Sequence, residues 1–347
     1  MNARASSRRR LVLFGLLVAA CAIAAAIAVV SGARSGSGGA PAATGARGIL
    51  PAAQAHRRPV VVFASRDPRR PAAGGQVAVA TLGAAPGRRA LTPLRCDRVD
   101  YSPAGIGLCL ARGHGLAASY RAEVFGPDLR VRHSLGVDGI PSRTRVSADG
   151  RLGAVTLFVA GHSYAAAGTF STATTLIDLS TGAKIAGLES FAVLDGERRV
   201  TAVDVNFWGV TFDPHDSDRF YSTLATGGKT YLIRGSVRAR EARVIRENVE
   251  CPSLSPDGTR IVFKKRGGSS ARPWRLTELD LATMRETPLA ERRSVDDQAD
   301  WLDAEHVLYG IDGAVWVVRA DGRGRPRRYL ADASSPAAVW VTLLQVV

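Results

Sequence analysis

Charged residues, and lysine in particular, are scarce in this chain of 347 residues. Charged side chains make up 22% of it, and only four of the 46 basic residues are lysines. This low charge, with 36 glycines and 17 prolines, favours a turn-rich protein over a helical bundle or a coiled coil. The preference for arginine indicates the codon usage of a GC-rich genome. A hydrophobic fraction of 46% is enough to form a sizeable core.

Acidic residues are absent from residues 1–58, which carry eight arginines. This segment supplies about half of the net charge of +15, because the remaining residues have 38 basic and 31 acidic side chains. That excess is dilute, and no basic run alternates with aromatic residues. No nucleic-acid partner is therefore expected.

Charge is also absent from Leu11 to Val30, directly after Arg8–Arg10. A helix of this length spans a hydrocarbon core of about 30 Å. Arginines before the run place the N-terminus inside the cell. The sequence thus predicts a single-pass cell-membrane protein, with residues 1–10 cytoplasmic, residues 11–30 as the transmembrane helix and the rest extracytoplasmic.

Two other interpretations of the apolar run stay open. The sequence Val18-Ala19-Ala20-Cys21 is similar to a lipoprotein signal, which would place a lipid on Cys21. A cleaved signal peptide would have an apolar region of about 7–15 residues. The run continues beyond Cys21, which favours an uncleaved anchor. Residues 31–58 are rich in Gly, Ala, Ser and Pro and are predicted to form a flexible tether.

Short β-rich runs separated by turn residues fill the chain from residue 59 onwards, with no helical period. The clearest unit is a strand, a turn at Ser255-Pro256-Asp257-Gly258 and a second strand. A weaker copy has Ser147, Asp149 and Gly150 in the turn. Equivalent turns recur every 42 to 66 residues, about the length of a four-stranded propeller blade. The marker positions for this spacing are Ser102, Ser147, Asp213, Ser255 and Leu302.

The segment Leu254–Phe263 resembles the repeat of TolB-type β-propellers, and Trp316–Val318 with Asp321-Gly322 resembles the third strand and turn of that repeat. The exported region as a whole is similar to TolB-like proteins of high-GC Gram-positive bacteria. The resemblance implies an all-β, six-bladed propeller used for protein contacts, with no catalytic residues. Only the tether stands where TolB has an N-terminal globular domain.

The propeller is predicted to occupy residues 59–347, with the C-terminus completing blade one. Residues 59–65 begin with what should be a second strand, and residues 336–347 can supply the missing first strand. This closure leaves no open sheet edge in the ring. The predicted blades are 59–95 with 336–347, 96–139, 140–190, 191–247, 248–291 and 292–335.

Cys96 and Cys109 flank the turn at Ser102–Gly105 almost symmetrically, so they are expected to face each other across two strands and form a disulfide. Cys251 lies in a predicted inner strand and is expected to be a buried thiol. Five tryptophans recur in predicted strands and are expected to pack between blades. These are Trp208, Trp274, Trp301, Trp316 and Trp340.

Charged residues of both signs occur in the predicted first strands, which line the channel of a propeller. Converging carboxylates can hold a cation and support lactonase or lyase chemistry. The arginines among them favour mutual neutralisation in a solvated ion-pair network instead, with no cofactor. The channel candidates are Asp97, Arg98, Arg143, Arg145, Asp204, Glu250 and Asp300.

The function favoured by the sequence is a monomeric, non-catalytic scaffold of the cell envelope that binds another envelope protein or a peptide. Rigid sheets that hold variable loops suit this role. The alternative is an exported propeller hydrolase or lyase, lactonase-like, with a cation in its central channel.

Overall fold

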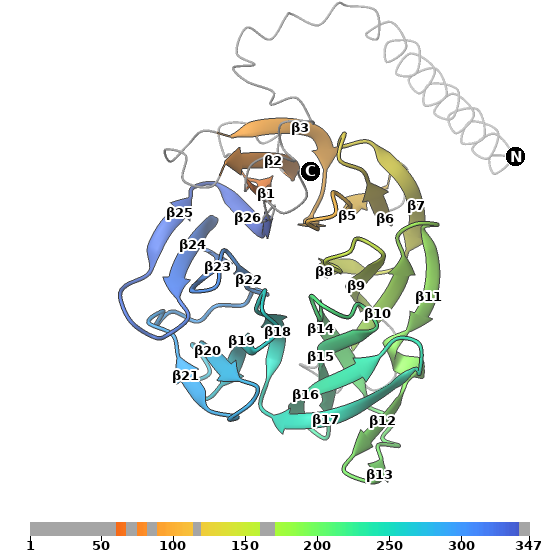
Figure 1. Ribbon diagram of the computed structural model, residues 1–347, viewed down its shortest axis with the longest axis vertical. Coiled ribbons are helices and arrows are strands. Elements are labelled where there is room, and N and C mark those ends of the chain that lie inside the picture. The colour runs from red at the N-terminus through yellow and green to blue at the C-terminus, as the bar shows by residue number, and fades with distance from the viewer. Residues whose placement is uncertain (1–59, 67–74, 82–88, 114–118, 160–170, 340–347) are drawn as a thin grey trace, which may run out of the picture. The chain divides into compact units, whose positions relative to one another are not determined.

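The computed structural model describes residues 60–66, 75–81, 89–113, 119–159 and 171–339. In these ranges six β-sheets follow one another around a centre, and the first strands of neighbouring sheets contact each other (Figure 1). The predicted all-β, six-bladed propeller is therefore confirmed. The one helical element among the described residues is a short 3-10 turn, η3 (Leu188–Ser190).

No helix within these ranges is long and apolar enough to cross a membrane. The predicted transmembrane helix at 11–30 and the tether at 31–58 lie outside the described residues, as do Cys21 and the cytoplasmic segment 1–10. They remain predictions of the sequence.

Blades one to three are four-stranded sheets, whose strands are named from the innermost outwards. Blade one consists of β26 (Ala333–Val339), β1 (Val60–Ser65), β2 (Gln76–Thr81) and β3 (Ala90–Arg95). Blade two consists of β4 (Arg98–Tyr101), β5 (Gly107–Arg112), β6 (Tyr120–Phe125) and β7 (Val131–Val137). Blade three consists of β8 (Ile140–Val146), β9 (Leu152–Val159), β10 (Ser171–Asp178) and β11 (Ala183–Gly187).

Blades four to six follow the same order, but blade four has six strands. Its main strands are β14 (Asn206–Phe212), β15 (Arg219–Thr226), β16 (Lys229–Ser236) and β17 (Glu241–Glu247), and beyond them lie β12 (Ala192–Asp195) and β13 (Arg198–Arg199). Blade five consists of β18 (Glu250–Leu254), β19 (Arg260–Arg266), β20 (Trp274–Asp280) and β21 (Glu286–Pro288). Blade six consists of β22 (Asp300–Trp301), β23 (His306–Ile311), β24 (Ala314–Arg319) and β25 (Arg327–Leu330).

The ring is closed by strands from opposite ends of the described chain. β26 pairs with β1 in antiparallel register, with Val339 opposite Val60 and Ala337 opposite Val62. The strand starts at Ala333, three residues before the start that the sequence indicated. Residues 340–347, Trp340 included, lie outside the described part. This pairing gives blade one its innermost strand.

Hydrophobic clusters fill the six junctions between neighbouring blades. Val60 and Val62 of β1 pack toward blade two, whereas Val61 and Phe63 of the same strand pack toward blade six. Successive side chains of a strand point to opposite faces, so a sheet covered on both faces needs an unbroken apolar run. This explains why the sequence of β1 reads as a hydrophobic run without alternation.

The repeated turns have the same hydrogen bonds in blades three and five. In blade five the Ser255 hydroxyl donates to Asp257, and the Gly258 amide donates to the Ser255 carbonyl at 2.9 Å. In blade three Ser147, Asp149 and Gly150 make the equivalent bonds, the turn bond again 2.9 Å long. Both glycines have a positive φ, 72° and 71°, which L-residues rarely adopt.

The Cys96–Cys109 disulfide is present, with Cα atoms 5.4 Å apart. Its geometry differs from the predicted pairing, because Val99 stands opposite Cys109 in the sheet and Cys96 precedes β4. The bond therefore joins the connection from blade one to the second strand of blade two. Cys251 is a buried free thiol, as expected.

Candidate functional site

The centre of the ring is bridged by an arginine. Arg145 of β8 donates to the Asp300 carboxylate of β22 at 2.8 Å and to the Ala299 carbonyl at 3.0 Å. Asp100 of β4 lies 3.8 Å from the same guanidinium. Blades two, three and six thus meet in one buried group of two carboxylates and one cation.

Both carboxylates of this group also accept backbone hydrogen bonds. Asp100 accepts the Val146 amide at 2.6 Å, and Asp300 accepts the Ala338 amide of the closing strand at 2.7 Å. Burial raises the pKa of Asp100 to about 6, and Arg145 offsets only part of that effect. Burial likewise raises the pKa of Asp300. One guanidinium is shared by two acids, so the pair holds a proton more tightly than ordinary aspartates do.

A second charged group lies around blade five, where the Lys264 and Glu250 side chains are buried and that of Asp296, in the connection that follows, is 61% exposed. The Lys264 ammonium is 2.6 Å from the Asp296 carboxylate and 3.8 Å from that of Glu250. Glu250 also accepts from Arg266 at 2.9 Å. Burial acts to raise the pKa of Asp296, but Lys264 and Arg143 hold it below its ordinary value.

The connection between blades five and six fills part of the central space. Gln298 in this connection donates to the carbonyls of Val210 in blade four and Pro252 in blade five, both at 3.0 Å. Arg143 of blade three donates to the Ser142 carbonyl at 2.8 Å and lies 3.5 Å from the Asp296 carboxylate of this connection. Side chains and backbone from blades three, four and five therefore meet this connection at the centre.

The structure places four of the seven channel candidates in these buried groups: Arg143, Arg145, Glu250 and Asp300. Arg98 lies beside them and donates to the Ser142 carbonyl. Asp97 instead pairs with the exposed Arg112, and Asp204 lies in a separate pocket. The expected solvated network is wrong for the Arg145–Asp300 pair, whose side chains are 11% and 16% exposed, whereas the Asp296 side chain that pairs with Lys264 is 61% exposed.

Among the described residues, no three His, Cys, Asp or Glu side chains converge as a metal site would require. The central carboxylates instead face guanidinium and ammonium groups, which neutralise them.

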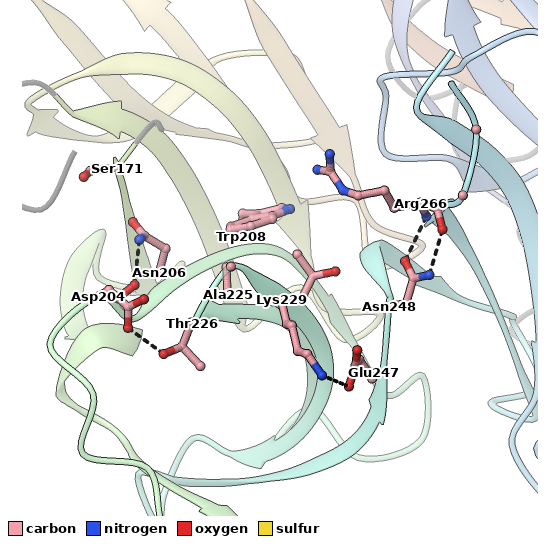
Figure 2. A pocket seen from close by; sticks show the side chains of 14 residues that line it. Ser171, Asp204, Asn206, Trp208, Ala225, Thr226, Lys229, Glu247, Asn248 and Arg266 are labelled. Carbon is pink, nitrogen blue, oxygen red and sulfur yellow. Dashed lines mark hydrogen bonds and ion pairs between the residues drawn. The ribbon is translucent and has the colours of Figure 1, made fainter. Parts of the chain in front are cut away.

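A pocket of about 660 Å³ opens between blades four and five. Six strand ends surround it, because β10, β14 and β16 begin at the pocket while β15, β17 and β19 end there. Figure 2 shows the side chains that these strand ends and the loops between them contribute. The labelled residues are Ser171, Asp204, Asn206, Trp208, Ala225, Thr226, Lys229, Glu247, Asn248 and Arg266.

One wall of the pocket is organised around Asp204. Its carboxylate accepts the Thr226 hydroxyl at 2.6 Å and the Gly227 amide at 2.7 Å. These hydrogen bonds lower the pKa of Asp204. The neighbouring Asn206 accepts the Thr172 amide at 2.9 Å, which ties the wall to blade three.

The other wall carries matched charges. Lys229 and Glu247 form an ion pair of 3.0 Å, and the Asn248 side chain binds both the amide and the carbonyl of Arg266. The Arg266 guanidinium reaches Glu250 and lies 5.5 Å from the centre of the Trp274 ring. Trp208 lies between the two walls (Figure 2) and is 7% exposed.

The sequence identified one residue of this pocket, Asp204, but assigned it to the channel. It assigned Trp208 to packing between blades. The remaining residues lie at strand ends, where no repeat motif marks them. The one feature of the sequence that could have marked this pocket is the excess of polar residues at the ends of β15 to β17.

No protein-family model matches the chain, and no curated protein sequence matches it. Among solved structures, TolB from Acinetobacter baumannii superposes with a TM-score of 0.55 at 17% identity, over 81% of this chain and 66% of that one. A chain of a nidogen/laminin complex gives a TM-score of 0.53 at 10% identity, over 82% and 99%. A puromycin-hydrolyzing peptidase of Mycobacterium tuberculosis gives 0.48 at 14% identity, over 79% and 44%.

These identities establish the fold and nothing finer, since unrelated functions share the propeller architecture. The structural neighbours include TolB as well as peptidases. The six sheets, the closure by β26 and the superposition agree with one another. This chain has a six-bladed β-propeller fold of the kind seen in TolB.

Proposed function

We propose that this chain is a non-catalytic scaffold of the cell envelope that binds another protein or a peptide through the pocket between blades four and five. The observation that carries this proposal is the pocket itself, which is framed by six strand ends and whose polar groups are held in place by hydrogen bonds. Walls fixed in this way lose little conformational entropy when a partner binds.

The centre of the ring supports the non-catalytic part of the proposal. Its carboxylates bind Arg145, Lys264 and Arg266, and the Arg145–Asp300 pair joins blades three and six. The alternative, a hydrolase or lyase with a channel cation, requires carboxylates that converge on an ion. No observation in the described ranges favours that arrangement over the ion pairs.

The envelope location rests on the sequence. The apolar residues 11–30 would anchor the chain, and the tether 31–58 would hold the propeller outside the membrane as a single-pass, monomeric protein. Protease treatment of intact cells should digest the propeller and spare a short N-terminal fragment. An intact-mass measurement of that fragment would separate an uncleaved helix from a lipid-modified Cys21. A propeller protected in intact cells and digested only after lysis would refute the location.

Photocrosslinking in intact cells tests the binding face. Gly267 lines the pocket, and an added side chain there would meet no atom within 4 Å. Gly136, on the outermost strand β7, has equally open space and is the matched control. A photoreactive amino acid at position 267 should capture a partner protein, whereas the same amino acid at 136 should not. Capture from 136 alone, or from neither position, would refute the proposal.

A further inference from the structure

We propose that the pocket binds a cationic side chain, arginine or lysine, of its partner, with Asp204 as the opposing charge. This inference rests on the proposed function and names the chemistry of the same site. Its starting point is the carboxylate of Asp204, whose donors within the described ranges are neutral.

The two donors found on Asp204 are the Thr226 hydroxyl and the Gly227 amide. They stabilise the charged carboxylate and lower its pKa, so the group is ionised at neutral pH. Among the described residues, no Arg, Lys or His side chain forms an ion pair with Asp204. A carboxylate oxygen has lone pairs for more than one donor, so a further donor from a ligand can be accepted.

The other charged side chains that line the pocket already have ion-pair partners. Lys229 pairs with Glu247 at 3.0 Å, and Arg266 pairs with Glu250 at 2.9 Å. Asp204 is therefore the charged lining residue that has no ion-pair partner among the described residues. A ligand that carries a positive charge complements it, and one that carries a carboxylate is repelled.

The shape of the pocket fits the same ligand. Trp208 lies between the Asp204 wall and the Arg266 wall (Figure 2). Trp208 is 7% exposed and so forms a largely buried wall, and the cavity of about 660 Å³ has room for the long side chain of lysine or arginine. The amide of Gly227 comes from the turn between β15 and β16, whose two glycines have positive φ values of 58° and 73° that other residues rarely adopt.

Fluorescence anisotropy with labelled pentapeptides tests this inference on the full chain in detergent micelles. The peptides have the form Gly-Ser-X-Ser-Gly, where X is arginine, lysine, norleucine or glutamate. The arginine and lysine peptides should bind roughly tenfold or more tightly than the norleucine peptide, as expected for a hydrogen bond to a charged group. Added salt should weaken this preference.

Asp204→Asn removes the charge, while its one carbonyl oxygen can still accept the Gly227 amide and its NH2 group can donate to the Thr226 hydroxyl, so it should abolish the preference for arginine and lysine. Asp195→Asn is the control, because Asp195 is an exposed aspartate outside the pocket. Equal binding of all four peptides by the wild-type chain overturns the inference, whether or not the variant folds. An unchanged preference in folded Asp204→Asn overturns it as well. A partner captured from position 267 alongside either result leaves the proposed function intact, so the two failures are distinguishable.

Discussion

Arg145 and Asp300 connect blades three and six, which lie on opposite sides of the ring (Figure 1), through a hydrogen-bonded ion pair of 2.8 Å. The two residues are 155 positions apart in the sequence and belong to different sheets. Asp300 also accepts the amide of Ala338 in the closing strand. Through Asp300, the closing strand β26 of blade one is therefore linked to Arg145 in blade three.

Replacing Arg145 by methionine should strongly destabilise the propeller. Methionine replaces the stem of arginine with an unbranched, uncharged side chain, so Asp100 and Asp300 stay buried without their cation. Removing one partner of a buried ion pair costs about 3–5 kcal/mol. Arg112→Met is the matched control, because the Arg112 side chain is 75% exposed and its pair with Asp97 should contribute about 1 kcal/mol or less. Urea unfolding measures both. Equal losses in the two variants would contradict the role of the central pair.

Mild acid should stabilise the protein. The folded-state pKa of Asp100, about 6, lies above the ordinary aspartate value, so the folded state binds this proton more tightly than the unfolded state. The free energy of unfolding should consequently rise as the pH falls from 7 through 6 toward 4. The melting temperature at pH 5 should exceed that at pH 7. Carboxylates whose pKa is lowered in the folded state, such as Asp204 and Asp257, reduce the free energy of unfolding at still lower pH, where the unfolded chain takes up their protons first.

The variant Asp100→Asn isolates the cause of this pH dependence. Asparagine can still accept the Val146 amide, and Arg145 is left entirely to Asp300. The difference in melting temperature between pH 7 and pH 5 should shrink in the variant and persist in Asp195→Asn. A wild-type protein that loses stability between pH 7 and pH 5 would contradict the assignment.

The disulfide should contribute about 3 kcal/mol to the free energy of unfolding, because it closes a loop with a sequence separation of 13. Guanidinium unfolding with and without a reductant measures this contribution. In a Cys96→Ala, Cys109→Ala double variant the reductant should have no effect. If the wild type is equally insensitive to the reductant, the bond does not constrain the chain.

The fold was predictable from the sequence because each blade repeats a local signal, the turn with Ser, Asp and Gly between two apolar runs. The same hydrogen bonds occur around Ser147 and Ser255, so one unit seen clearly identified the other. The extra strand β12 was not predictable, because its parallel pairing with β17 joins residues about 50 positions apart without a motif.

The candidate site was less predictable than the fold. A side chain such as Arg145 reaches across the ring, so its partner depends on the diameter of the closed structure and not on local sequence. Asp204 and Arg266 belong to different blades and meet at the pocket only after the blades pack. The residue types indicated neutralisation, but the burial of these pairs follows from the connection that carries Gln298 into the centre.

Metal removal distinguishes the scaffold from the alternative enzyme. Because arginine and lysine side chains neutralise the central carboxylates, calcium and EDTA should leave the melting temperature unchanged. The comparison uses the full chain in detergent with each additive in turn. A higher melting temperature in calcium that EDTA reverses would support a cation in the channel.

The repeated turns offer a matched pair of substitutions, Gly258→Ala and Gly150→Ala. Both glycines have a positive φ near 70°, so a methyl group at either position should cost about 1–2 kcal/mol in backbone strain. Around Gly258 the nearest atoms to an added Cβ are 3.7 Å away, which is ordinary contact. Around Gly150 the Ile106 Cγ1 and Ala104 Cβ atoms would lie at 3.0 and 3.1 Å.

Gly150→Ala should therefore lose more stability than Gly258→Ala, because overpacking adds to the same backbone strain. Thermal unfolding of both variants beside the wild type provides the measurement. The difference between the two isolates the packing of the blade-three turn against blade two, since the turns have equivalent hydrogen bonds. Equal losses would mean that the two blades separate enough to admit the methyl group, and hence that this junction is less rigid than the buried core between the blades indicates.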